Sequence, residues 1–135
     1  MTLSGQCLCG NITYTCDAEP ESMTYCHCDT CRRITGSAFN IGVGIPKEAL
    51  KVSGNIKRHT HTNGSTREFC PTCGSPLFTI GSQTVWIRAG SLDNAEALQP
   101  TRQMWTELSV PWAHIPTGIS SYPQHASSTD GNVTG

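Results

Sequence analysis

Seven of the eight cysteines in this 135-residue chain fall into three short groups. Thiols separated by one or two residues can direct their sulfur atoms at a single metal ion, and four thiolates complete a tetrahedral zinc site. Seven ligands therefore predict one site with four cysteines and one with three. The groups are Cys7 and Cys9 in GQCLCGN, Cys26, Cys28 and Cys31 in YCHCDTC, and Cys70 and Cys73 in FCPTCGS.

Local geometry favours one assignment of these ligands. Residues two apart in a strand point to the same face, so Cys7 and Cys9 can bind one ion. Cys70 and Cys73 form a Cys-x-x-Cys turn followed by Gly74, which can adopt the tight backbone of a zinc knuckle. The two pairs together predict a closed structural site, and the middle group is then a separate site with three ligands.

A second assignment stays open on spacing alone. Cys28 and Cys31 could join the distal Cys-x-x-Cys pair in a zinc ribbon. That arrangement would leave Cys7, Cys9 and Cys26 without a partner.

The cysteine content also bears on the cellular compartment. The N-terminal sequence MTLSGQCLCG has no basic segment followed by an apolar run, so we expect no signal peptide. Without export, metal binding explains eight cysteines better than disulfides do, and we expect a cytoplasmic protein.

No window approaches the roughly 20 apolar residues of a transmembrane helix. A net charge of −1 predicts no binding to nucleic acid or to a membrane surface.

Short apolar runs separated by turn residues predict an all-β domain of antiparallel strands with short helical turns. Cys16 continues the alternation of Ile12 and Tyr14, which favours a buried apolar role. We expect one domain over residues 1–123 and a disordered tail over 124–135, where the sequence is small and polar. Strands are expected within residues 11–16, 38–45, 49–62, 65–70, 76–80 and 84–90, and helical turns within 28–36 and 94–100.

A zinc ion held by three cysteines has room for a fourth ligand. Three thiolates leave a net charge near −1, and the softness of such a site favours sulfur. An incoming thiol would be held as a thiolate, which is nucleophilic at neutral pH. The cluster therefore predicts a thiol-activating site. Arg32 and Arg33 follow it directly and could offset its charge or grip a substrate carboxylate. Solvated surface arginines are the alternative.

Two further features receive a structural interpretation. His59 and His61 share one face of an expected strand beside a turn, which is typical of a solvated hairpin arm. Trp112, after Pro111, is expected to pack the last segment onto the sheet.

Five motifs resemble, in order, those of the glutathione-dependent formaldehyde-activating enzyme family, which shares its domain with centromere protein V. The motifs are GQCLCGNITY, CHCDTCRRITGSAF, REFCPTCGSPLF, IRAGSLD and WTELSVPW, and they span residues 5–112. The resemblance implies a β-tent fold, in which antiparallel sheets are built around zinc. It also implies two Zn²⁺ per chain, a structural ion on Cys7, Cys9, Cys70 and Cys73 and a catalytic ion on Cys26, Cys28 and Cys31. We add Arg32 to the catalytic candidates because it follows the cluster directly.

The reaction that the resemblance implies is the addition of glutathione to formaldehyde by S-(hydroxymethyl)glutathione synthase, a carbon–sulfur lyase. The thiolate attacks the aldehyde carbon, and an acid, His27 or a water, protonates the alkoxide. Gln103 and Ser109 stand where relatives often carry a histidine and a lysine, and loss of the lysine weakens the grip on an anionic tripeptide. Two alternatives stay open: a family enzyme with another small-molecule or thiol substrate, and a non-catalytic zinc-stabilised binding module. Homo-oligomerisation is open as well.

Overall fold

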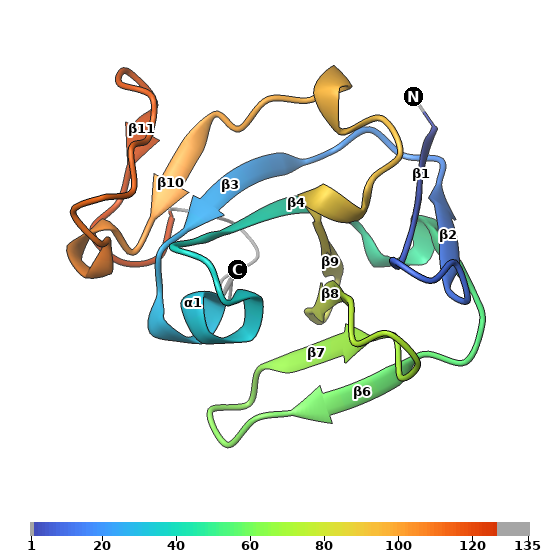
Figure 1. The fold of residues 1–135 in the computed structure, drawn as a ribbon. Coiled ribbons are helices and arrows are strands. Elements are labelled where there is room, and N and C mark those ends of the chain that lie inside the picture. Colours follow the sequence, from blue (N-terminus) through green and yellow to red (C-terminus); the bar gives the residue numbers. More distant parts are fainter. Residues whose placement is uncertain (1, 127–135) are drawn as a thin grey trace.

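The computed structural model describes residues 2–126 of the chain, and this part is mainly β-sheet (Figure 1). The described residues contain one α-helix, α1 (Asp29–Thr35), and short 3₁₀ turns at Lys47–Ala49, Ala89–Ser91, Ala95–Ala97 and Thr106–Leu108. The expected mainly β fold is confirmed. The strands are β1 (Leu3–Gln6), β2 (Thr13–Cys16), β3 (Ser22–Cys26), β4 (Asn40–Pro46), β5 (Leu50–Ser53), β6 (Lys57–Thr60), β7 (Thr66–Phe69), β8 (Pro76–Ile80), β9 (Thr84–Arg88), β10 (Arg102–Met104) and β11 (Ser120–Ser121).

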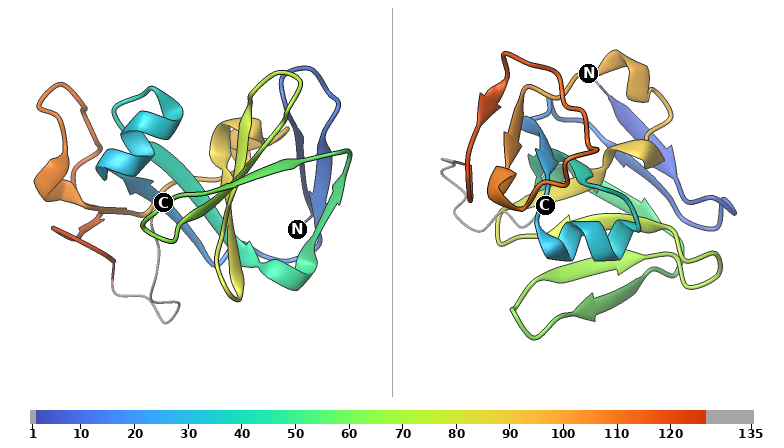
Figure 2. Two further views of the ribbon diagram at one scale, coloured as in Figure 1. Left: turned by 90° about the horizontal axis from the view of Figure 1, so that it is seen from below. Right: turned by 60° about the vertical axis from the view of Figure 1, so that its left-hand side comes forward.

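The strands form two sheets, which Figure 2 shows from two further directions. One sheet has three strands in the order β1-β2-β5, and the other has eight in the order β11-β10-β3-β4-β9-β8-β7-β6. Neighbouring strands are antiparallel except that β10 runs parallel to both β3 and β11. The larger sheet is therefore mixed, because the chain crosses from β9 to the far side of β3 before it forms β10.

The main hydrophobic core lies between the two sheets. One face of the large sheet contributes Val43, Ile45 and Ile87, which are completely buried. Tyr14 of β2 meets Phe78 of β8 edge-on, with ring centroids 5.0 Å apart. Each such apolar side chain contributes roughly 1.5–3 kcal/mol when it leaves water. Cys16 belongs to this core, as its alternation with Ile12 and Tyr14 predicts.

The opposite face of the large sheet carries polar and sulfur-containing side chains. The register places Cys26 opposite Asn40 and Thr79 opposite both Arg67 and Trp86. Alternate residues of a strand share a face, so these side chains line the same surface. Two buried residues of this face, Cys26 and Trp86, pack with Cys31 of α1 in a second, smaller cluster.

Glycine on β4 makes space for the tryptophan of this face. A Cβ atom added at Gly44 would lie 2.6 Å from Oγ of Ser22 and 3.2 Å from Nε1 of Trp86. Gly44 and Trp86 are direct neighbours across the β4–β9 pair. The missing side chain therefore lets the indole ring lie flat on the sheet.

The C-terminal segment returns to the domain near Trp105. Trp105 has a φ of 59°, and its N–H donates to the carbonyl of Gln124 over 2.9 Å. His125 stacks edge-on against its ring, and Ala126 is buried. The first three residues of the expected tail thus contact the domain. The rest of that tail, 127–135, lies outside the described residues, so its disorder stays a prediction.

Trp112 does not pack on the sheet as expected, because 68% of its surface is exposed. The chain turns before it reaches the sheet, with the N–H of Ala113 donating to the carbonyl of Val110. Across the described residues, no helix has the length and apolar character needed to cross a bilayer.

Candidate metal centres and the cavity beside them

The structure gathers the seven cysteines into two groups, and within each group the sulfur atoms lie no more than 4.8 Å apart. The first group joins the Cys-x-Cys pair to the distal Cys-x-x-Cys pair, and the second joins the three cysteines around α1. This grouping agrees with the assignment favoured by local geometry and differs from the zinc ribbon. The groups are Cys7, Cys9, Cys70 and Cys73, and Cys26, Cys28 and Cys31.

The spacing of the four-cysteine group fits zinc. Sγ of Cys9 lies 3.6 Å from that of Cys7 and 3.8 Å from that of Cys70. A tetrahedral zinc with four sulfurs at about 2.3 Å requires sulfur atoms about 3.8 Å apart. The knuckle closes where Gly74, with a φ of 79°, donates its N–H to the carbonyl of Cys70. These residues could hold a closed zinc site.

A hydroxyl group favours the thiolate form in this first group. Oγ of Ser75 lies 3.1 Å from Sγ of Cys73, and this contact, with the Ser75 backbone, lowers the pKa of Cys73 to about 5. The same hydroxyl accepts the N–H of Leu8 over 3.0 Å. Ser75 therefore connects the two loops that carry the four cysteines. None of the eight cysteines of the chain forms a disulfide bond.

The three-cysteine group is assembled at the junction of β3 and α1. Cys26 ends β3, Cys28 is the N-cap of α1, and Cys31 lies in its first turn. Cys26 and Cys31 are completely buried, and only 8% of Cys28 is exposed. The N–H of Cys31 donates to Sγ of Cys28 over 3.3 Å. The helix start therefore fixes the direction of two of the three sulfur atoms.

The electrostatics of this group concentrate negative charge on one sulfur. Hydrogen bonds from the thiols of Cys26 and Cys31, together with the charge of Arg67, lower the pKa of Cys28 to about 2. Donating a hydrogen bond to the sulfur of Cys28 stabilises the protonated thiol of Cys26 and so raises the pKa of Cys26. Three soft sulfur donors, one of them a thiolate, are a donor set that suits Zn²⁺.

His27 lies between Cys26 and Cys28 in the sequence, but its side chain is directed at Gln103 and not at the sulfur atoms. Its side chain is completely buried, and Nε2 lies 2.9 Å from Oε1 of Gln103. Its ring packs edge-on against Phe39, with centroids 5.8 Å apart. Neither ring nitrogen joins the sulfur atoms of the three-cysteine group. Gln103, which departs from the histidine common in relatives, is thus the partner of His27.

The two arginines after the cluster separate on the surface of α1. Nη2 of Arg32 pairs with Oδ1 of Asp29 over 2.8 Å, while its Nε is buried without a hydrogen-bond partner among the described residues. Arg33 is exposed. Arg32 therefore has one buried nitrogen without a partner among the described residues, and Arg33 lines a separate cavity together with Asp29.

Two further arginines lie beside the cluster, and the sequence did not single them out. Arg67 and Arg88 are 3% and 5% exposed, and both donate to Oγ1 of Thr79 over 3.1 Å. Burial and the neighbouring charge of Arg67 lower the pKa of Arg88 to about 10, against the opposing effect of Cys31 and Cys26. Arg67 lies in the largely polar strand β7 and Arg88 ends the apolar strand β9, so the sequence around them gives no clear signal of burial.

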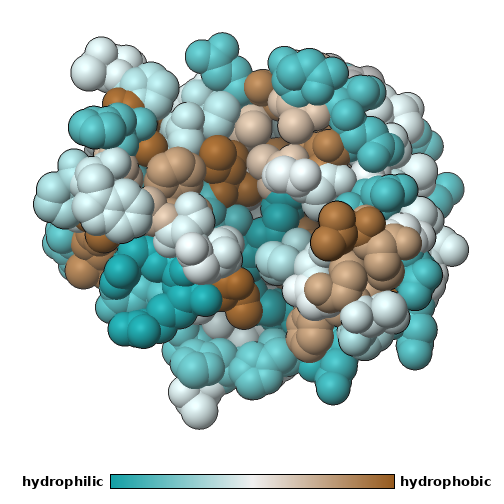
Figure 3. All heavy atoms as spheres, in the orientation of Figure 1, coloured by the Kyte–Doolittle hydropathy of each residue, from teal (hydrophilic) through white to brown (hydrophobic). Residues whose placement is uncertain are grey.

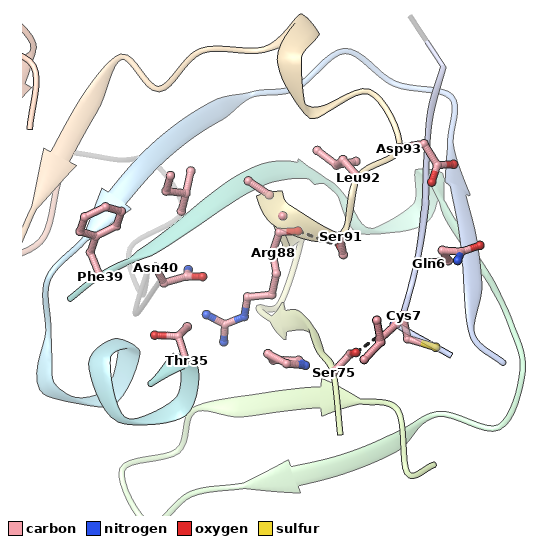
Figure 4. A pocket seen from close by; sticks show the side chains of 15 residues that line it. Gln6, Cys7, Thr35, Phe39, Asn40, Ser75, Arg88, Ser91, Leu92 and Asp93 are labelled. Carbon is pink, nitrogen blue, oxygen red and sulfur yellow. Dashed lines mark hydrogen bonds between the residues drawn. The ribbon is translucent and has the colours of Figure 1, made fainter. Parts of the chain in front are cut away.

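A cavity of about 640 Å³ opens next to Arg88. Figure 3, which has the orientation of Figure 1, shows hydrophilic residues in a hollow near the middle of the molecule. Figure 4 shows the guanidinium of Arg88 pointing into the cavity between Thr35, Asn40 and Ser75. Cys7 and Asp93 line its far side. The cavity thus extends from Arg88, whose charge acts on Cys31, to Cys7 of the four-cysteine group.

The fold and these two groups define a class of protein: a mainly β domain with four clustered thiols that could hold a metal ion and a second, three-thiol group beside two buried arginines. The family model of the glutathione-dependent formaldehyde-activating enzyme matches residues 2–108. The chain therefore belongs to this family, as the five motifs predict.

Two relatives extend the comparison. A protein of Schizosaccharomyces pombe, named only as an uncharacterised lyase, is 30% identical over 88 residues, which are 63% of this chain and 64% of that protein. The chain thus spans less than two thirds of that relative's length. A crystal structure of a Rhodobacter sphaeroides protein matches with a TM-score of 0.57 and 18% identity, over 88% of this chain and 98% of the other. This second likeness shows the fold.

Proposed function

We propose that the protein is a zinc-dependent carbon–sulfur lyase that activates a thiol for addition to, or release from, a carbonyl or related electrophilic carbon. One observation carries the proposal. Three buried cysteine sulfurs converge, and within residues 2–126 no fourth cysteine, histidine or carboxylate joins them. Family membership and the name of the yeast relative, a lyase, support the same reaction class.

Zinc on Cys26, Cys28 and Cys31 would lower the pKa of an incoming thiol, so that it is present as a thiolate at neutral pH. The buried charges of Arg67 and Arg88 would stabilise the negative charge that the cysteines and the substrate bring together. Four thiolates on the second group would hold a structural zinc, which gives two ions per chain.

The cavity beside Arg88 would receive the electrophile. As the thiolate sulfur attacks the carbonyl carbon, the electron pair of the C=O bond moves to oxygen, and a donor such as Arg88 would stabilise that charge. The oxygen then takes a proton. Water that enters the cavity is the proton source that fits, since His27 is directed at Gln103. Release of the thiol reverses these steps.

Glutathione and formaldehyde are the first substrates to test, because the family is named for them. Arg32 stays a candidate site residue, because its Nε is buried and has no hydrogen-bond partner within residues 2–126. Eight cysteines without a disulfide bond suit the reducing environment of the cytoplasm. A binding module with two structural zinc ions is the competing function.

Exchange NMR on equilibrium mixtures of thiol, aldehyde and adduct tests the proposal. The zinc-loaded wild type should speed interconversion for at least one thiol and aldehyde pair. Cys28→Ala should stay folded with one zinc per chain and lose the acceleration, whereas Cys16→Ala, which changes a core cysteine outside both groups, should keep it. A folded protein with two zinc ions that accelerates none of a panel of thiols and aldehydes would contradict the proposal.

A further inference from the structure

A second cavity, of about 410 Å³, is lined by α1, by the β6–β7 hairpin and by Arg67. Its walls are α1 and the β6–β7 hairpin, which Figure 1 shows below the helix. We call it the histidine pocket. The residues used below are Asp29, Arg33 and Ile34 from α1, His59 and His61 from the hairpin, and Arg67.

The histidine pocket is rich in donors for an anion. It presents two guanidinium groups, those of Arg33 and Arg67, and two imidazole rings whose centroids lie 6.1 Å apart. An imidazole N–H can donate a hydrogen bond in either protonation state. The carboxylate of Asp29 is paired with Arg32 over 2.8 Å, so it offsets little of this positive charge. The charge balance favours a negatively charged ligand.

The pocket is joined to the three-cysteine group by Arg67. This side chain lines the pocket, and its charge acts on Cys28. It also shares the Thr79 hydroxyl with Arg88, which lines the larger cavity. Cys28 and Cys31 moreover flank, in the sequence, two of the α1 residues that line the pocket, Asp29 and Thr30. A ligand with its sulfur at the cysteines could therefore extend an arm into the pocket.

The walls also suit the chain that carries an anionic group. Ile34 is 39% exposed and provides an apolar surface beside the basic residues. A methylene chain could pack on this surface while a terminal carboxylate accepts hydrogen bonds from Arg33 and the imidazole rings.

We propose that the histidine pocket binds a carboxylate of the thiol substrate, so that the protein selects carboxylate-bearing thiols over neutral ones. The proposal rests on the thiol-binding role assigned above to the three cysteines. It gives His59 and His61 a specificity role in place of the solvated hairpin arm suggested by the sequence.

Calorimetric titration of the zinc-loaded full chain with S-methylglutathione tests the pocket apart from the metal, because the blocked sulfur has no thiolate to offer. The acid should bind about tenfold more tightly than its dimethyl ester. The triple variant Arg33→Gln, His59→Gln, His61→Gln should lose this preference. Arg58→Gln is the matched comparison, since Arg58 lies on the same strand and pairs with Glu68 over 2.9 Å. It should bind like the wild type, and all three proteins should melt at similar temperatures.

The outcomes separate this proposal from the proposed function. Equal binding of acid and ester, no binding of the acid, or an unchanged preference in the triple variant would overturn the pocket assignment. Cobalt-substituted protein tests the thiol site with 2-mercaptoethanol, whose sulfur should add a charge-transfer band without using the pocket. If the band appears and the preference is unaffected by the triple variant, only the pocket assignment fails. If the band is absent, the thiol role fails, and the pocket cannot be a substrate subsite.

Discussion

Arg67 and Arg88 donate to the same oxygen atom, because Nη1 of the first and Nη2 of the second each lie 3.1 Å from Oγ1 of Thr79. Two like charges held this close and away from water need negative charge nearby. The three-cysteine group supplies it, since the charge of Arg67 acts on Cys28 and that of Arg88 on Cys31. The arginines and cysteines therefore form one electrostatic unit.

The shared hydroxyl should matter for stability. Thr79→Val keeps the side-chain volume and removes the acceptor of two charged hydrogen bonds, each of which contributes about 1.5–3 kcal/mol. We expect the free energy of unfolding in urea to fall by about 3 kcal/mol. Thr60→Val, which removes an exposed hydroxyl at 3.1 Å from that of Thr66, should change it by less than about 0.5 kcal/mol. Equal effects of the two substitutions would show that the arginines do not depend on Thr79.

The pair of His27 and Gln103 gives a second test. Gln103→Ala would leave the buried Nε2 of His27 without its partner, which costs about 1–3 kcal/mol. Ser121→Ala removes two exposed hydrogen bonds, one from Nε2 of Gln103 and one to the carbonyl of Ile119, and should cost much less. Thermal melts of both variants measure the difference. A Gln103→Ala variant as stable as Ser121→Ala would mean that His27 finds another partner.

The cysteine grouping could be predicted because it depends on local geometry. The expected strand geometry of the Cys-x-Cys pair is wrong, because β1 ends at Gln6 and Cys7 and Cys9 lie at the turn that follows. This turn and the Cys-x-x-Cys turn still fix their sulfur atoms within a few residues. The alternation of β2 and the short apolar run of β8 are local patterns as well, and both strands were predicted. The three-residue β10 was missed, because its sequence Arg-Gln-Met has no pattern and only its parallel partners hold it in place.

The buried arginines could not be predicted from the sequence. A charged residue in a strand is usually exposed. Arg67 and Arg88 become buried only because β7, β8 and β9 pair side by side and carry them beneath α1. Their neighbours in space, Cys28 and Cys31, lie more than 35 residues away in the sequence. Trp112 shows the reverse case, since a large apolar side chain was expected inside and lies exposed.

The four-cysteine group should be required for folding. Cys70→Ser removes a completely buried ligand, and a structural zinc contributes its binding energy to folding. We expect the variant to lose one zinc and the cooperative melting transition by circular dichroism. Cys16→Ala, also in the core, should keep both zinc ions and lose only about 1 kcal/mol. A Cys70→Ser variant that melts like the wild type would refute the structural role.

Tyr14 should make the protein sensitive to alkali. Burial raises its pKa to about 12, although the hydroxyl of Ser91 at 2.6 Å opposes this. Between pH 10 and 12 the unfolded chain has lost the phenol proton while the native state keeps it. The native state then binds more protons, so stability falls as pH rises, by up to about 1.4 kcal/mol per pH unit.

Tyr14→Phe removes the titrating group and should show a shallower decline above pH 10. Urea unfolding at pH 8, 9, 10 and 11 gives both curves, and their difference isolates Tyr14 from other groups that titrate in both proteins. Parallel curves over this range would show that the phenol of Tyr14 has an ordinary pKa in the native state.

The central claim is that zinc on Cys26, Cys28 and Cys31 takes a sulfur atom from outside the chain. Anomalous diffraction at the zinc edge, from crystals soaked with a small thiol, tests it most directly. We predict two zinc ions per chain, one bound by four cysteines of the protein and one by three cysteines and the soaked sulfur. A single zinc ion, or a second ion whose fourth ligand is a side chain of the protein, would contradict the account.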